Sequence, residues 1–239
     1  MRSQMLALGR AARCVARRGL HIKTLTTPNE NALKYVSTDG ELLQERGAPS
    51  VEIRNFDMEL IRQAPLAEKL FAQVPGVEAV MIGDDFVTVS KDAELGWAQV
   101  TPRVLEVLTQ QLASGQAAVQ GQVAVGGTER FQYDEEEQEI SDTIEEIIQT
   151  RVRPAIMDDG GDIQYRGWDP ETGRVYLKLQ GACKSCSSSE VTLKHGIESM
   201  LKHYVEEVSG VEQVLDVEEQ VALHEFGRLE ERLRARTSK

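Results

Sequence analysis

Apolar residues alternate with polar ones, or recur at helical spacing, in two stretches of the chain. In the first stretch, short apolar runs predict strands at 32–36, 51–53, 77–83 and 85–90. The last two strands flank a turn at 83–85. Apolar residues at helical spacing predict one helix over 65–73 and a second over roughly 96–113. No residues in this stretch have the spacing of a catalytic group.

The second stretch begins with a helix over 140–156, which Pro154 is expected to bend or end. The sequence DDGGD at 158–162 then stops the helix, because glycine readily adopts the left-handed conformation that a helix end needs. Alternating residues predict a hairpin with strands over 162–168 and 174–180. A last helix carries an apolar stripe expected to face the core: Leu193, Ile197, Met200, Leu201, Tyr204 and Val208.

Residues 114–139 separate the two stretches and read as a flexible linker. They mix Gly and Gln with the acidic run 135–137, which we expect to be solvated, and they show no sustained period. We therefore predict an α+β fold of two small domains, 25–113 and 140–217, each a small sheet packed with helices. A charged tail follows at 218–239.

The N-terminal segment is basic, whereas the chain as a whole is acidic. The first 29 residues contain six Lys or Arg and no Asp or Glu, yet the net charge of the 239 residues is −12. Arginines interrupt the apolar runs, as in a mitochondrial transit peptide, which predicts a transit peptide at 1–24 and a mitochondrial matrix protein. The acidic remainder argues against nucleic acid as a partner. No apolar run approaches the roughly 18 residues of a membrane span, so no membrane partner is expected.

Two of the three cysteines, Cys183 and Cys186, stand three positions apart in GACKSC, just before the last helix. Ser187 and Glu190 match a capping box, which predicts that this helix starts after both thiols. The helix dipole and the intervening Lys184 favour negative charge, so the pKa values of both thiols are expected to be lowered. Since thiolates bind metals, the two cysteines are candidate metal ligands.

Three functions compete for this pair, and a Gly/Ser/Lys loop argues against two merely structural buried cysteines. A dithiol oxidoreductase also places C-x-x-C between a strand and a helix, although its second cysteine commonly lies inside the first helical turn. A zinc site would need His195 and His203, whose spacing does not fit finger-type sites, and His195 is expected to face solvent. An iron–sulfur cluster usually takes four thiolates, so two chains related by a two-fold axis would share it.

Longer motifs also carry a family resemblance. The segment from Val152 to Val217, with RPAIMDDGGDI, GACKSC and VTLKHGIESML, closely resembles the NifU-like C-terminal domain, which assembles or carries iron–sulfur clusters. Residues 22–113, with TTPN, ALKYV, PLAEKLF and GDDFVTVSK, resemble the N-terminal Nfu domain of mitochondrial members. The resemblance implies a scaffold or carrier with no catalytic residues, not an enzyme.

The resemblance further implies that Cys183 and Cys186 ligate a [4Fe–4S] cluster bridging two subunits, with [2Fe–2S] as the alternative. It implies a homodimer that receives clusters from upstream cluster assembly proteins. Its clients would be apo-iron–sulfur proteins such as lipoyl synthase and aconitase-type or respiratory enzymes. The family commonly has proline after the second cysteine, whereas this chain has Ser187, which leaves a looser loop.

Overall fold

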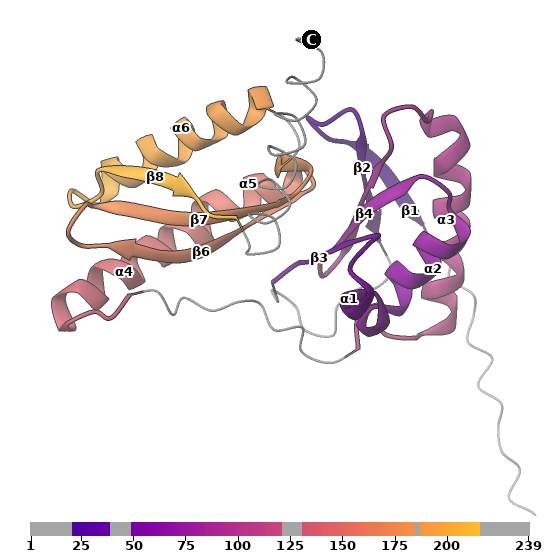
Figure 1. Cartoon of the computed structure of the whole chain (residues 1–239), viewed down its shortest axis with the longest axis horizontal. Coiled ribbons are helices and arrows are strands. Elements are labelled where there is room, and N and C mark those ends of the chain that lie inside the picture. The colour runs from indigo at the N-terminus through magenta and orange to yellow at the C-terminus, as the bar shows by residue number, and fades with distance from the viewer. Residues whose placement is uncertain (1–20, 39–48, 121–130, 185–186, 216–239) are drawn as a thin grey trace, which may run out of the picture.

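The computed structural model describes residues 21–38, 49–120, 131–184 and 187–215, and gives only the backbone of 184 and 187–191. These residues form two α+β halves, each a small sheet packed with helices (Figure 1). The predicted fold class is therefore confirmed. Among the described residues, no helix combines the length and the apolarity that crossing a membrane would require.

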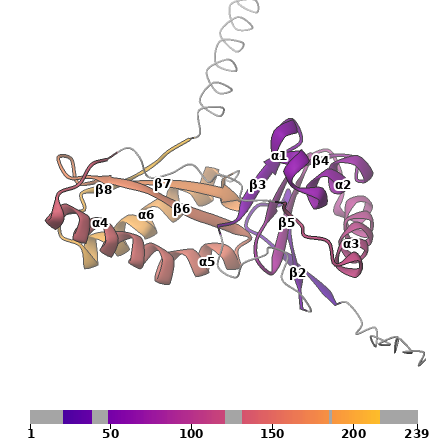
Figure 2. The same ribbon diagram turned by 90° about the horizontal axis from the view of Figure 1, so that it is seen from below.

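The N-terminal half is a five-stranded antiparallel sheet with helices on one face. In spatial order its strands are β1 (Ile22–Thr26), β2 (Ala32–Ser37), β5 (Phe86–Lys91), β4 (Val77–Ile82) and β3 (Val51–Arg54). Its helices are α1 (Met58–Gln63), α2 (Pro65–Gln73) and α3 (Trp97–Ser114). Figures 1 and 2 both show these helices on the side of the sheet that faces away from the C-terminal half.

Local sequence explains the two longer helices of this half. Pro65 occupies the first turn of α2, where a missing N–H is harmless, and Leu66 and Leu70 are buried in the core. Helix α3 presents Val100 and Val104 to the same core and ends at Gly115, whose φ of +64° provides the left-handed cap. The core of this half thus lies between the helices and one face of the sheet.

Most predicted elements of this half are confirmed, but β1 and α1 were not predicted. Strand β1 begins at Ile22, so the predicted end of the transit peptide at residue 24 falls inside a strand.

The C-terminal half packs its helices on one face of a three-stranded sheet (Figure 2). Its elements in chain order are α4 (Glu135–Ile147), the π-helical turn η1 (Ile148–Val152), α5 (Arg153–Asp158), β6 (Gly161–Asp169), β7 (Arg174–Gly181), the 3₁₀ turn η2 (Ala182–Lys184), α6 (Ser187–Tyr204) and β8 (Gly210–Gln213). Strands β6 and β7 form the predicted hairpin. Strand β8, which was not predicted, pairs parallel to β7 after the crossover through α6.

The predicted bend at Pro154 takes the form of a π-helical turn just before it. Proline has no N–H for the helical ladder, so a regular helix cannot continue through it unchanged. Here η1 ends at Val152 and Pro154 lies in the first turn of α5. Helix α5 ends at Asp158, and Gly160, with a φ of +78°, provides the predicted turn.

Ordered structure extends into both ends of the segment 114–139 that the sequence assigned to a linker. Ala118 and Val119 are buried in the N-terminal core. At the other end, Asp134 caps α4 in a capping box with Glu137, so the acidic run lies in the first helical turn, where the helix dipole favours negative charge. The linker prediction was too long because composition alone does not distinguish a solvated acidic run from the start of a helix.

The apolar stripe predicted for the last helix is confirmed in part: α6 ends at Tyr204, so Val208 is buried beyond the helix, and Tyr204 does not face the core. Ile197 and Leu201 are buried and Leu193 and Met200 pack against the same cluster, but Tyr204 is 48% exposed. Its hydroxyl accepts a hydrogen bond from Arg151 at 2.7 Å, and the guanidinium lies over its ring. An aromatic residue with a polar end can leave the core when a cation covers its face.

Candidate metal centre

Cys183 lies in the η2 turn, directly after β7 and before α6. This position on the C-terminal half is the predicted junction of strand and helix. The backbone around it is tightly folded: Gly181 has a φ of +67°, and the amide of Ala182 donates a hydrogen bond to the carbonyl of Gly160 at 3.3 Å. The cysteine turn is therefore joined to the turn that ends α5.

Gly161 leaves room for the Cys183 thiol because it has no side chain. A Cβ placed on Gly161 would lie within 2.5 Å of the Cys183 Sγ, and 3.0 Å from the carbonyl oxygen of Gln180. No real Cβ approaches so closely, so the second glycine of DDGGD is required for the thiol to occupy this position. The sequence predicted only that this glycine ends the helix, and not its contact with the thiol.

The Cys183 thiol is buried. Its residue is 7% exposed, belongs to the apolar core of the C-terminal half and is not in a disulfide. The Gly/Ser/Lys composition of the loop argued against merely structural buried cysteines. Cys183 is instead buried in that core.

Cys186, like Cys14 and the tail beyond residue 215, lies outside the described residues. The described part of α6 begins at Ser187, the first described residue after Cys186, so the start of the helix after both cysteines stays a prediction. The predicted capping box uses side chains that lie outside the description. The pairing of Cys183 with Cys186 as ligands stays a prediction.

The histidines of the zinc alternative do not converge on Cys183. His195 is exposed on α6, as expected, and His203 is also exposed, with its ring edge-on to Tyr204. Within the described ranges, no group of three or more His, Cys, Asp or Glu residues is arranged to hold a metal ion.

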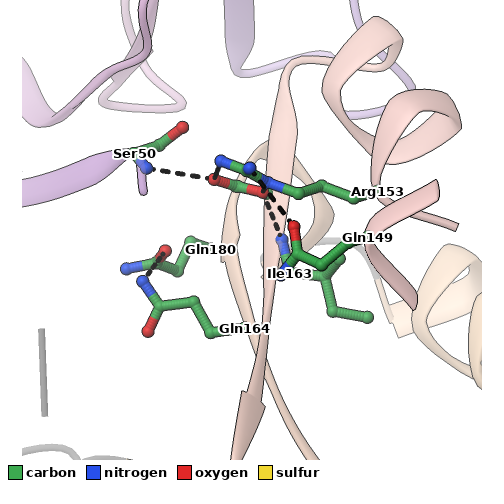
Figure 3. A network of polar contacts seen from close by, with 7 residues as sticks. Ser50, Gln149, Arg153, Ile163, Gln164 and Gln180 are labelled. Carbon is green, nitrogen blue, oxygen red and sulfur yellow. Dashed lines mark hydrogen bonds and ion pairs between the residues drawn. The ribbon is translucent and has the colours of Figure 1, made fainter. Parts of the chain in front are cut away.

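A buried ion pair lies beside the glycine turn (Figure 3). Asp162 is fully buried and accepts two hydrogen bonds from the Arg153 guanidinium, at 2.7 Å from Nε and 3.0 Å from Nη2. It also accepts from the amides of Ile163, at 2.8 Å, and Ser50, at 3.1 Å. Burial alone would raise the pKa of Asp162, but the hydrogen bonds and the charge of Arg153 hold that pKa below its usual range.

Sequence reasoning missed this pair because its parts carry no motif. Arg153 and Asp162 stand nine positions apart, and Ser50 lies more than a hundred residues away in the other half. One available signal was Asp162 itself, an acidic residue at the start of a strand that is otherwise rich in buried positions. A charge at a buried strand position predicts a partner nearby.

The fold and this turn define a class of protein: two small α+β halves, one of which presents a cysteine at a strand-to-helix junction beside a double-glycine turn. Comparison with known proteins narrows the class. Residues 144–212 match the NifU-like domain, and residues 22–115 match the N-terminal domain of the Nfu/NifU scaffold proteins. The chain belongs to the family of NifU-like proteins that carry both domains.

Individual relatives cover most of the chain. It is 56% identical over 229 residues to a mitochondrial NifU-like protein of Saccharomyces cerevisiae, spanning 91% of this chain and 90% of that protein. It is 40% identical to the mitochondrial NFU1 iron–sulfur cluster scaffold homolog of Homo sapiens, spanning 84% of this chain and 74% of that protein. These relatives confirm the prediction of a mitochondrial protein.

A solved structure also matches part of the chain. The solution NMR structure of a NifU-like protein from Saccharomyces cerevisiae is 46% identical and aligns with a TM-score of 0.42, covering 51% of this chain and 100% of that chain.

Proposed function

We propose that this protein is an iron–sulfur cluster scaffold and carrier of the mitochondrial matrix. The observation that carries the proposal is a cysteine in a C-x-x-C motif at a strand-to-helix junction, within a domain of the NifU-like family. Thiolates are the usual ligands of iron–sulfur clusters. The cluster is the cargo of such a protein, which binds it and passes it on without catalysing a reaction.

The number of ligands supports a site shared by two chains. The NifU-like domain contains two cysteines, Cys183 and Cys186, whereas a cluster usually takes four thiolates. Two chains related by a two-fold axis supply four at one isologous site. We therefore propose a homodimer with a bridging [4Fe–4S] cluster, and a [2Fe–2S] cluster as the alternative.

Transfer of the cluster to another protein follows from the proposed site shared by two chains. A cluster held between two chains becomes accessible when the chains part, so the partner apo-protein can replace the thiolates of one chain with its own. The proposed clients are apo-iron–sulfur proteins such as lipoyl synthase and aconitase-type or respiratory enzymes, and upstream assembly proteins supply the cluster. The human relative is itself named an iron–sulfur cluster scaffold homolog.

Anaerobic reconstitution of the full chain tests this proposal. Protein reconstituted with iron and sulfide should contain both in equal amounts and show the visible absorption of a cluster. Cys183→Ser and Cys186→Ser should each abolish this binding, while the matched control Cys14→Ser should retain it. If iron and sulfide stay bound in both motif variants, the two cysteines are not the ligands. If zinc binds tightly without sulfide, a structural metal site replaces the carrier proposal.

A dithiol oxidoreductase is the second candidate because Cys183 lies between a strand and a helix, as a redox C-x-x-C pair does. The predicted capping box of Ser187 and Glu190 argues against it, because that box would start the helix after both cysteines, whereas redox pairs commonly place their second cysteine in the first helical turn. The reduced protein should therefore fail to catalyse reduction of insulin disulfides. Robust turnover in that assay, with no cluster bound after reconstitution, would favour the oxidoreductase.

A further inference from the structure

Among the described residues, one face of the N-terminal sheet is covered by no helix of its own half, yet its central residues are buried. Lys34, Met81, Phe86 and Thr88 are at most 7% exposed. The apolar members of this set, Met81 and Phe86, belong to neither hydrophobic core. Helices α1–α3 cannot cover these side chains, because they pack on the opposite face with Tyr35, Val87 and Val89. Another part of the molecule must therefore cover this face.

Strand register places three of these residues, Lys34, Thr88 and Met81, in one row across the sheet, and Phe86 two positions along β5 from Thr88. Lys34 of β2 lies opposite Thr88 of β5, and Thr88 lies opposite Met81 of β4. Directly opposed residues point to the same face of a sheet, so the three side chains share a surface. Ser50 lies just before β3, two positions from Glu52, which is opposite Met81, so Ser50 belongs to the same face; it is 1% exposed. We call the surface formed by Lys34, Ser50, Met81, Phe86 and Thr88 the docking face.

The 157–162 turn of the C-terminal half covers the docking face through three hydrogen bonds. Lys34 Nζ donates to the carbonyl of Met157 at 2.7 Å, and Thr88 Oγ1 donates to the carbonyl of Gly160 at 2.8 Å. The amide of Ser50 donates to the Asp162 carboxylate at 3.1 Å (Figure 3). All three donors belong to the docking face and all three acceptors to the turn, so the two surfaces are complementary.

Charge adds to this complementarity. The 157–162 turn ends helix α5, whose last carbonyls carry the negative end of the helix dipole, and it also contains Asp158 and Asp159. Lys34 is the cation that meets this end. Burial lowers the pKa of Lys34, while the charges of Asp158, Asp85 and Asp159 act to raise it. Its ammonium group also lies 4.5 Å from the centre of the Phe86 ring, a cation–π contact within the docking face.

The same turn supports the candidate ligand on its other side. Gly161 lies against the Sγ of Cys183, and the Gly160 carbonyl that accepts from Thr88 also accepts from the amide of Ala182. Gly181, the residue at the end of β7, is packed against the Met81 side chain, which leaves no room for a Cβ. The docking face therefore contacts both turns that hold Cys183.

We propose that the N-terminal half is an intramolecular cover for the thiol site, docked through this face onto the 157–162 turn, and that docking holds Cys183 in its inward position. Undocking releases both turns and lets Cys183 move to the surface. The biological meaning rests on the proposed function: Cys183 is buried in the docked form and so cannot meet a cluster shared with a second chain, and the undocked form is therefore the one that binds cargo.

The rate of alkylation of Cys183 tests the cover directly. The full chain with Cys14→Ser and Cys186→Ser keeps Cys183 as its one thiol, and N-ethylmaleimide, a neutral reagent, is added with no iron present. Lys34→Glu turns a carboxylate toward the Met157 carbonyl and the two aspartates, and should raise the rate about tenfold. The matched control is Lys23→Glu, the same change at an exposed site on the neighbouring strand, which should leave the rate unchanged.

A neutral variant separates undocking from a change of charge near the thiol. Thr88→Val keeps the shape of the side chain but removes the donor to Gly160, and should raise the rate about threefold. Hydrogen exchange at the amides of 160–163 should accelerate in parallel. If Lys34→Glu fails to fold, Thr88→Val decides the question. Unchanged alkylation in the folded variants, or equal acceleration by Lys23→Glu, would overturn the cover.

The alkylation experiment and the reconstitution test separate claims, so either claim can be wrong while the other holds. Alkylation is measured on cluster-free protein, so a protein that never binds a cluster can still show the cover. If the cluster binds and the docking variants leave alkylation unchanged, the cover is wrong and the carrier function stands. If alkylation responds as expected and no cluster forms, the carrier function is wrong and the cover stands.

Discussion

The buried ion pair between Arg153 and Asp162 provides the most quantitative prediction for stability. The Asp162 side chain is fully buried and that of Arg153 is 12% exposed, and two short hydrogen bonds join them. Asp162→Ala leaves the guanidinium buried without its counter-charge, and the amides of Ser50 and Ile163 lose an acceptor. Breaking one side of a buried pair lowers the free energy of unfolding by about 3–5 kcal/mol.

An exposed pair in the same half provides the control. Arg174 and Glu212 meet at 2.8 Å, but their side chains are 57% and 46% exposed, so Glu212→Ala should lower the free energy of unfolding by less than about 1 kcal/mol. Urea unfolding at neutral pH measures both variants. In a Trp97→Phe background the fluorescence of Trp168 reports on the C-terminal half alone, because the chain has two tryptophans. Equal losses in the two variants would refute the reasoning.

The pH dependence of the same pair has a definite sign. The folded-state pKa of Asp162 lies below its unfolded value of about 3.9, so the unfolded state binds the proton first as pH falls. The stabilisation is therefore complete above about pH 4 and is lost as pH falls through the lower, folded-state pKa. In Asp162→Asn, which has no charge to titrate, this part of the acid destabilisation should disappear. An unchanged acid profile would show that Asp162 does not contribute.

Three further outcomes are expected. Gly161→Ala should displace Cys183 from its inward position and raise its rate of alkylation, because the new Cβ would overlap Sγ; an unchanged rate would show that the contact is not needed. Asp134→Ala should lower the stability of the C-terminal half by about 1 kcal/mol in urea, because α4 loses its cap, and no change would rule out that cap. Replacing the arginines of 2–18 with glutamine should block import into isolated mitochondria, and unchanged import would refute the predicted transit peptide.

Hydrophobic periodicity predicted the elements whose apolar pattern is complete within a few turns. Helix α2 has the predicted bounds, and the β6–β7 hairpin follows the alternation of Val175 and Leu177. Strand β1 was missed because it is an edge strand with almost all of its residues exposed, so it shows no alternation. Strand β8 was missed because its four residues are too few to establish a period.

Only the part of the site that belongs to a local sequence motif was predicted. Cys183 could be proposed from C-x-x-C spacing, but its burial depends on residues that the motif does not contain. One signal was present in β5, where Phe86, Val87, Thr88 and Val89 are all buried. A strand that buries both faces must be covered on both sides, which predicts a second layer but does not identify it. The contacts with the 157–162 turn join residues that are 72 to 123 positions apart.

The stoichiometry of the cluster tests the shared site most directly. Native mass spectrometry of the anaerobically reconstituted chain, with no added small thiol, should show a dimer that carries one [4Fe–4S] cluster. Removal of the cluster with a chelator should shift the protein toward monomer, because the bridging ligand bonds are lost. Cys183→Ser should show neither the cluster nor the cluster-dependent dimer. A monomer fully loaded with one [4Fe–4S] cluster and no other thiol would contradict the bridging site.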